Sequence, residues 1–95
     1  MQTPERPDDM RELIHQIARA LVDIPDAVDI EAVEKDESTA LRLRVDPTDV
    51  GKVIGKQGRT ARSIRTILGA VSVKHHHRYT LDILEDRDGL VAGRT

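Results

Sequence analysis

The spacing of apolar residues changes along this 95-residue chain, and these changes limit the folds that it can adopt. Between Met10 and Leu21 apolar residues recur every three or four positions, which predicts an amphipathic helix. Asp8 and Asp9 are placed to cap this helix and to face the positive end of its dipole, and Pro25 lies just beyond its end. The folded part of the chain is therefore expected to begin with one helix that buries a single apolar face.

Three later segments alternate between apolar and other residues, which is the pattern of strands with one buried face. They lie at positions 28–32, 41–45 and 79–83. The link at positions 34–38 is short and polar, so the first two strands are expected to form an antiparallel hairpin. In the second strand, Arg42 and Arg44 alternate with the core residues and are expected to face solvent.

Two helices are predicted between the second and third strands. Asp46 and Pro47 mark the start of the first helix, since aspartate is a good capping residue and proline suits the first helical position. That helix ends at Gly55, and the second begins near Arg59. The predicted order is helix, strand, strand, helix, helix, strand. Three helices can then cover one face of a three-stranded sheet, which is a two-layer α+β fold.

The two ends of the chain lack such patterns. Residues 1–9 are expected to form a flexible leader and residues 86–95 a flexible tail around a domain at residues 10–85. The core must be aliphatic, because the chain has no Phe, no Trp and one Tyr. The chain has no cysteine, which excludes disulfides and thiolate metal sites. No apolar run approaches the roughly 20 residues that span a membrane, so a cytoplasmic protein is expected.

The charged residues are distributed unevenly along the chain. The formal net charge is −2, yet residues 50–78 contain seven basic residues and no acidic residue. All 17 acidic residues lie outside this segment. A local positive surface on an otherwise acidic protein can attract phosphates while non-specific binding stays low. The charge pattern alone fits a solvated basic helix equally well.

The segment between the two predicted helices carries the pattern with the most chemical content. Gly55 and Gly58 enclose Lys56 and Gln57, and glycine permits a sharp turn and the close approach of a ligand backbone. The free N–H groups and the dipole at the start of the following helix favour an anion there. Spacing alone leaves open a tight helix–helix turn without a ligand.

Neighbouring residues extend this loop into a surface for nucleic acid. Lys52, Arg59 and Arg62 supply positive charge around the loop, where they can reach phosphates. Ile54 and Val53 are expected to border a groove whose apolar floor takes bases. Phosphate contacts would then position the strand while the groove contacts the bases.

Other functions find little support in the residues. A nucleotide-binding P-loop is excluded because three residues, not four, separate Gly51 from Gly55, and because Gln57 replaces the magnesium-binding hydroxyl. No buried parallel strand is expected to lead into the loop either. The histidines at 75–77 are expected to link a helix to a strand and not to hold a metal. The acidic residues form no catalytic pair, and one Tyr cannot form a base-stacking sheet.

Residues 53–59, Val-Ile-Gly-Lys-Gln-Gly-Arg, resemble the signature of KH domains, whose GXXG loop clamps a few nucleotides of a single strand. Because a helix and two strands precede the loop, the order resembles the type II, prokaryotic arrangement. The resemblance narrows to the small stand-alone bacterial KH proteins of the KhpA family and extends from about residue 13 to residue 85. It rests on ALVD at 20–23, PD at 25–26, VDP at 45–47, DVGKVIGKQGRT at 49–60 and IRT at 64–66.

The resemblance implies a non-catalytic role in binding single-stranded RNA, similar to that of an RNA chaperone, without a cofactor or a metal. The RNA-binding residues that it implies are Lys52, Ile54, Gly55, Lys56, Gln57, Gly58, Arg59 and Arg62. It also implies a homodimer, or a heterodimer with a larger KH protein of the Jag type. Two alternatives stay open, namely a dimerising module that docks on such a partner and a binder of single-stranded DNA.

Overall fold

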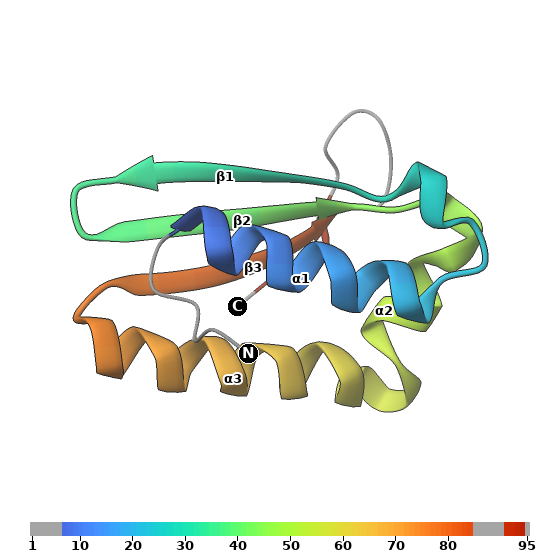
Figure 1. The fold of residues 1–95 in the computed structure, drawn as a ribbon. Helices are drawn as coiled ribbons and strands as arrows, with labels where there is room; N and C mark the ends of the chain where they lie inside the picture. The colour runs from blue at the N-terminus through green and yellow to red at the C-terminus, as the bar shows by residue number, and fades with distance from the viewer. Residues whose placement is uncertain (1–6, 85–90, 95) are drawn as a thin grey trace.

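The computed structural model describes residues 7–84 and 91–94, which form a layer of helices against a single sheet (Figure 1). The helices are α1 (Pro7–Leu21), α2 (Val50–Ile54) and α3 (Arg59–His75). The strands are β1 (Asp29–Lys35), β2 (Ser38–Arg44), β3 (Arg78–Leu84) and β4 (Val91–Arg94). Short 3-10 turns occupy Pro25–Ala27, Pro47–Asp49 and Lys56–Gly58. The α+β fold is confirmed, as is the predicted order of helices and strands from α1 to β3.

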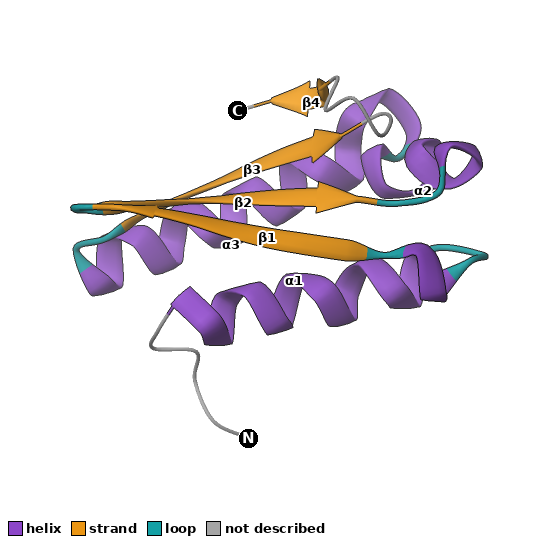
Figure 2. Cartoon of the chain, turned by 90° about the horizontal axis from the view of Figure 1, so that it is seen from above, coloured by secondary structure: helices purple, strands orange, loops and turns teal. Residues whose placement is uncertain are grey.

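The strands lie in the order β1-β2-β3-β4 within the sheet. β1 and β2 form the predicted antiparallel hairpin, with Lys35 opposite Ser38 and Asp29 opposite Arg44. β2 and β3 are parallel, and the chain crosses between them through α2 and α3, because parallel neighbours need a long connection. Figures 1 and 2 show α1 and α3 on the same side of the sheet. No helix in the described part of the chain has the length and apolar character that a membrane crossing requires.

The structure corrects the expectations for the two ends of the chain. Helix α1 begins at Pro7, so residues 7–9 of the expected leader are helical. Asp8 and Asp9 therefore lie inside the first turn and not before it, and proline suits this turn because its missing N–H needs no partner there. In the expected tail, residues 91–94 form β4, which pairs with residues 82–84 of β3. The other residues of the expected leader and tail, 1–6, 86–90 and 95, lie outside the described residues, as does residue 85.

The position of β2 also corrects one argument against a P-loop. This strand is buried at every second residue, runs parallel to β3 and precedes α2. A partly buried parallel strand therefore does lead toward the loop. The spacing of Gly51 and Gly55, and the presence of Gln57 where a hydroxyl is needed, still exclude a P-loop.

The core lies between the sheet and the helices and is aliphatic, as predicted. Leu41 and Leu43 of β2 are completely buried, and burial of a leucine side chain contributes about 1.5–3 kcal/mol. The helices contribute the fully or nearly fully buried residues Met10, Ile14, Ala18, Val53, Ala61, Ile64 and Leu68. Arg42 and Arg44 occupy the alternate positions of β2, on the opposite face, and are half-buried.

Helix α2 depends on its two ends, because five residues are too few to form a stable helix alone. Before its start, Asp46 caps the 3-10 turn Pro47–Asp49 that leads into α2, with Oδ2 accepting the N–H of Thr48 at 3.0 Å. Pro47 follows at the first position of the turn. At its other end lies Gly55, where the candidate loop begins. The placement of this short helix therefore sets the position of the loop.

Candidate nucleic-acid interface

The loop from Gly55 to Gly58 is a surface bend between α2 and α3. Helix α2 closes with the N–H of Gly55 donating to the carbonyl of Gly51 at 2.8 Å. The N–H of Gly58 then donates to the carbonyl of Gly55 at 3.0 Å, which forms one tight turn. Lys56 and Gln57 are exposed at the tip of this turn. A ligand can therefore reach the loop directly from solvent.

Both glycines have backbone conformations that other residues rarely adopt. Gly55 has φ 79° and ψ 169°, and Gly58 has φ 74° and ψ 12°. A Cβ atom at Gly55 would lie 2.8 Å from the backbone nitrogen of Thr60, whereas a Cβ atom at Gly58 would meet open space. Gly55 is therefore required by its torsion angles and by this close approach, while Gly58 is required by its φ angle alone. Between them, Gln57 is also left-handed, with φ 57°.

The first turn of α3 borders the loop and is electropositive. Its N-cap is Gly58, which has no side chain to accept hydrogen bonds from the first N–H groups of the helix. The N–H of Arg59 donates to the carbonyl of Lys56, whereas the later N–H groups of this turn and the helix dipole attract anions. Arg59 and Arg62 are exposed in the same turn, and Nη2 of Arg59 donates to Oε1 of Gln57 at 3.2 Å. A phosphate at this place would meet backbone N–H groups and two guanidinium groups.

The apolar residues beside the loop differ in accessibility. Ile54 is half-buried and packs against the core. Val53 is completely buried, so the expectation that its side chain borders a groove is wrong. It faces the core because it lies on the inner side of α2. Ile54 is therefore the apolar side chain that this end of α2 can offer to a ligand.

A hollow of about 220 Å³ lies between α3 and β3. Its lining residues are Arg65, Leu68, Gly69, Ser72, Arg78, Tyr79 and Thr80. Nη2 of Arg65 donates to the carbonyl of Leu81 at 3.2 Å, and Oγ of Ser72 accepts the N–H of Tyr79 at 2.9 Å. The sequence reasoning assigned no site to these residues. The spacing of Arg62, Arg65, Gly69 and Ser72 by three or four positions could have placed them on one helix face.

Lys52 is the predicted site residue with the most unexpected surroundings. Its Nζ lies 3.2 Å from Oδ2 of Asp23 and 3.3 Å from Oδ1 of Asp49, and these two carboxylates raise the pKa of Lys52. The Asp49 side chain is buried, and its Oδ2 accepts the N–H of Ile24 at 3.0 Å. Burial acts to raise the pKa of Asp49, but hydrogen bonds from backbone N–H groups and the nearby Lys52 bring it below its ordinary value. Lys52 therefore lies near the loop, but two carboxylates already offset its positive charge.

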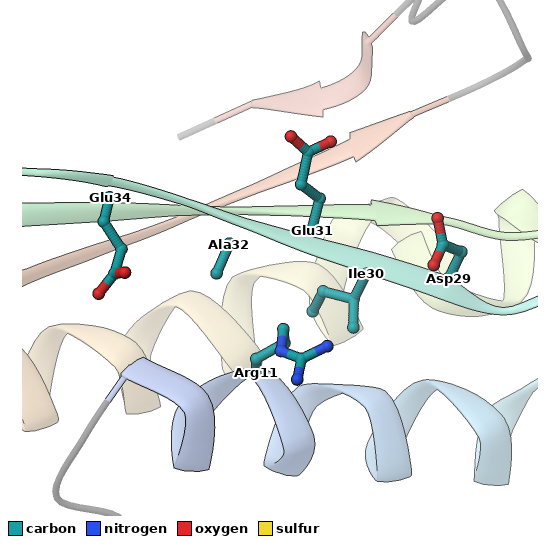
Figure 3. A pocket seen from close by; sticks show the side chains of 6 residues that line it. All are labelled: Arg11, Asp29, Ile30, Glu31, Ala32 and Glu34. Atoms are coloured by element: carbon teal, nitrogen blue, oxygen red, sulfur yellow. The ribbon is translucent and has the colours of Figure 1, made fainter.

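A second hollow, of about 420 Å³, lies at the edge of the sheet between α1 and β1 and has an acidic lining (Figure 3). Its lining residues are Arg11, Asp29, Ile30, Glu31, Ala32 and Glu34. Figure 3 shows Arg11 on α1 near Ile30, with Glu31 pointing away from the helix. Three carboxylates against one guanidinium group disfavour a phosphate. This hollow therefore contrasts with the basic surface of the loop and α3.

The histidines at 75–77 lie at the link between α3 and β3, as predicted. His76 closes α3 with φ 52°, and Nε2 of His77 lies 2.7 Å from Oγ1 of the buried Thr39. The ring of His77 also contacts that of Tyr79, with centroids 4.9 Å apart. Within residues 7–84 and 91–94, no group of three His, Asp or Glu side chains is placed to hold a metal ion.

Comparison with known proteins identifies the family of this chain. The family model for the KhpA/KhpB KH domain matches residues 11–83. A protein of Clostridium acetobutylicum named RNA-binding protein KhpA is 47% identical over 75 residues, which cover 79% of this chain and 100% of the relative. Proteins of the same name from Borreliella burgdorferi and Aquifex aeolicus are 50% identical over 74 residues and 45% identical over 76 residues. These matches cover 78% and 80% of this chain, and 90% and 96% of the relatives. The chain therefore belongs to the KhpA/KhpB family of KH domains.

Proposed function

We propose that this protein binds single-stranded RNA, without catalysis, by clamping the RNA backbone at the loop of residues 55–58. The observation that carries the proposal is the exposed bend with two positive-φ glycines beside the start of α3. Such a bend lets a sugar–phosphate chain approach the backbone N–H groups closely. The relatives from Clostridium acetobutylicum and Borreliella burgdorferi are named RNA-binding proteins, which supports RNA as the ligand.

The proposed contact residues surround this bend and act through charge, small size or apolar surface. They are Lys52, Ile54, Gly55, Lys56, Gln57, Gly58, Arg59 and Arg62. Lys56 and Gln57, at the exposed tip, contact phosphate or sugar, while Ile54 offers apolar surface to a base. The hollow between α3 and β3 offers a continuation of the binding surface, because Arg65 and Arg78 line it.

The proposal is tested by changing Lys56 and Gln57 together to Asp and measuring the affinity for a fluorescein-labelled single-stranded RNA by anisotropy. Both residues are exposed, so the fold should remain intact, as circular dichroism can check. We expect most of the affinity to be lost, because two carboxylates would face the phosphates. The matched control changes Gln16 and Lys35 to Asp, since these exposed residues lie on α1 and β1, away from the loop. Equal affinity of the two folded variants would refute the site.

The salt dependence of binding gives a second measurement of the same proposal. Each phosphate neutralised on a single strand contributes about −0.7 to the slope of log K against log salt, so contacts by four cations give a slope of about −3. The four cations are Lys52, Lys56, Arg59 and Arg62. Competition with a DNA oligomer of the same sequence then separates RNA from single-stranded DNA as the preferred ligand.

The proposal also includes pairing with a second KH protein, a role similar to that of an RNA chaperone, and a cytoplasmic location. The protein forms a homodimer or a heterodimer with a larger Jag-type KH protein in this proposal, and the family model that matches the chain covers two kinds of KH protein. Two clamps in a dimer would raise the effective concentration of the second contact. Ile67 and Val73 of α3 are 47% and 78% exposed and provide apolar area for such pairing. A tight dimer in gel filtration that leaves RNA unshifted at low salt would instead favour a docking module.

A further inference from the structure

The surroundings of Lys52 suggest how the affinity of the loop for RNA is set. Lys52 lies on α2, three residues before Gly55, and Figure 1 places this helix beside the connection between α1 and β1. Its ammonium group contacts two carboxylates that belong to different environments. One is buried and the other is exposed, so the two carboxylates have different consequences for a ligand.

The inner partner, Asp49, is a fixed part of the fold. Its side chain is 1% exposed, and its Oδ2 accepts the N–H of Ile24, a residue 25 positions away in the sequence. A phosphate that took its place on Lys52 would leave a buried carboxylate without the lysine charge, which is costly, so this carboxylate is not exchanged. Asp49 therefore holds Lys52 in place and balances its single positive charge.

The outer partner, Asp23, is 76% exposed and lies 3.2 Å from the Lys52 ammonium. Exposed ion pairs contribute little to stability and exchange readily. An RNA phosphate, which presents oxygens of the same charge, can take the place of this carboxylate on Lys52. In the free protein, two carboxylates around one ammonium group leave a net negative charge at this point of the surface.

We propose that Asp23 is an internal competitor for RNA, which holds the Lys52 ammonium until a phosphate of the bound strand displaces it. The inference rests on the proposed RNA-binding function of the loop. Asp23 thereby lowers the affinity of the site, because binding must first break an ion pair and bring a phosphate close to a carboxylate. Asp23 thereby also limits the number of cations on this surface that can bind polyanions non-specifically.

The test is the variant Asp23→Asn, which keeps the size of the side chain and the backbone N–H while it removes the charge. We expect its affinity for the labelled RNA to rise by about two- to fivefold, the range that corresponds to one exposed ion pair. Asp36→Asn is the matched control, since it removes one exposed charge at the β1–β2 turn, far from the loop in Figure 1. Asp23→Ser serves as a second variant with a different side chain.

A double-mutant cycle with Lys52→Gln shows whether the effect acts through Lys52. The glutamine keeps an N–H donor for Asp49 but carries no charge. We expect Lys52→Gln alone to weaken RNA binding and the gain from Asp23→Asn to be smaller in its presence, because the ion pair is already lost and only the repulsion between Asp23 and the phosphate remains. An equal gain from Asp23→Asn and Asp36→Asn, or a gain from Asp23→Asn that is undiminished with Lys52→Gln, would overturn the inference. Retained RNA binding by the Lys56→Asp/Gln57→Asp variant would instead refute the proposed function itself.

Discussion

Replacement of Gly55 by alanine is a demanding test of the loop geometry. The φ and ψ angles of this residue, 79° and 169°, lie in a region that is almost restricted to glycine. The added Cβ atom would also lie 2.8 Å from the backbone nitrogen of Thr60, and this atom cannot move away without displacing the start of α3. Both effects act on the folded state, so we expect a large loss of stability.

The magnitude of this loss can be estimated from the two effects. A residue held in this region of φ and ψ costs about 1–3 kcal/mol. Overpacking against atoms that cannot move costs about 1–3 kcal/mol more. Gly55→Ala should therefore reduce the free energy of unfolding by about 4 kcal/mol, which lowers the Tm of a domain of this size by roughly 20 °C. At Gly58, with a positive φ but open space, the same change should cost about 1–2 kcal/mol.

Urea denaturation followed by circular dichroism at 222 nm measures these differences. Gly69→Ala is the internal control, because Gly69 is exposed inside α3 and a Cβ atom there meets nothing within 4 Å. This change should stabilise the protein by about 0.5–1 kcal/mol, since alanine suits a helix interior better than glycine. If Gly55→Ala were no more destabilising than Gly58→Ala, the described approach of Gly55 to Thr60 would be refuted.

Three further predictions concern the core and the buried polar groups. Leu41→Ala should lower the free energy of unfolding by about 2–5 kcal/mol in the same urea assay, because Leu41 is completely buried in a central strand. Thr39→Val should cost about 1 kcal/mol through loss of the hydrogen bond to His77, measured in the same urea assay. The pKa of Asp49 is below its ordinary value of 3.8, so its contribution is present above that pH and is lost in acid. Asp49→Asn should accordingly destabilise the protein at neutral pH and flatten the acid limb of a pH titration of stability.

The order of helices and strands could be predicted because each element repeats its apolar face within a few residues. The capping role of Asp46 could be predicted because its partner, Thr48, is only two positions away in the sequence. The strand β4 could not be predicted, because Val-Ala-Gly-Arg is short, contains glycine and pairs with only residues 82–84. The start of α1 was placed too late because its first turn contains charged residues and no apolar stripe.

The loop at the centre of the candidate site could be predicted from the sequence, whereas two features around the loop could not. The loop from Gly55 to Gly58 could be located because glycine spacing and basic residues are visible in one short segment. The contact of Lys52 with Asp23 could not, because it depends on how the connection after α1 packs against α2. The hollow between α3 and β3 was missed for a similar reason, since residues from two elements form it.

The side chains of Arg65 and Ser72 have a consequence for the kind of polymer that can lie beside β3. They reach from α3 and occupy the carbonyl of Leu81 and the N–H of Tyr79, which an added peptide strand would need for its own hydrogen bonds. A polypeptide therefore cannot extend the sheet at these positions without first displacing both side chains. A polynucleotide carries no amide ladder and loses nothing there. At these positions the edge of β3 is thus closed to an added peptide strand.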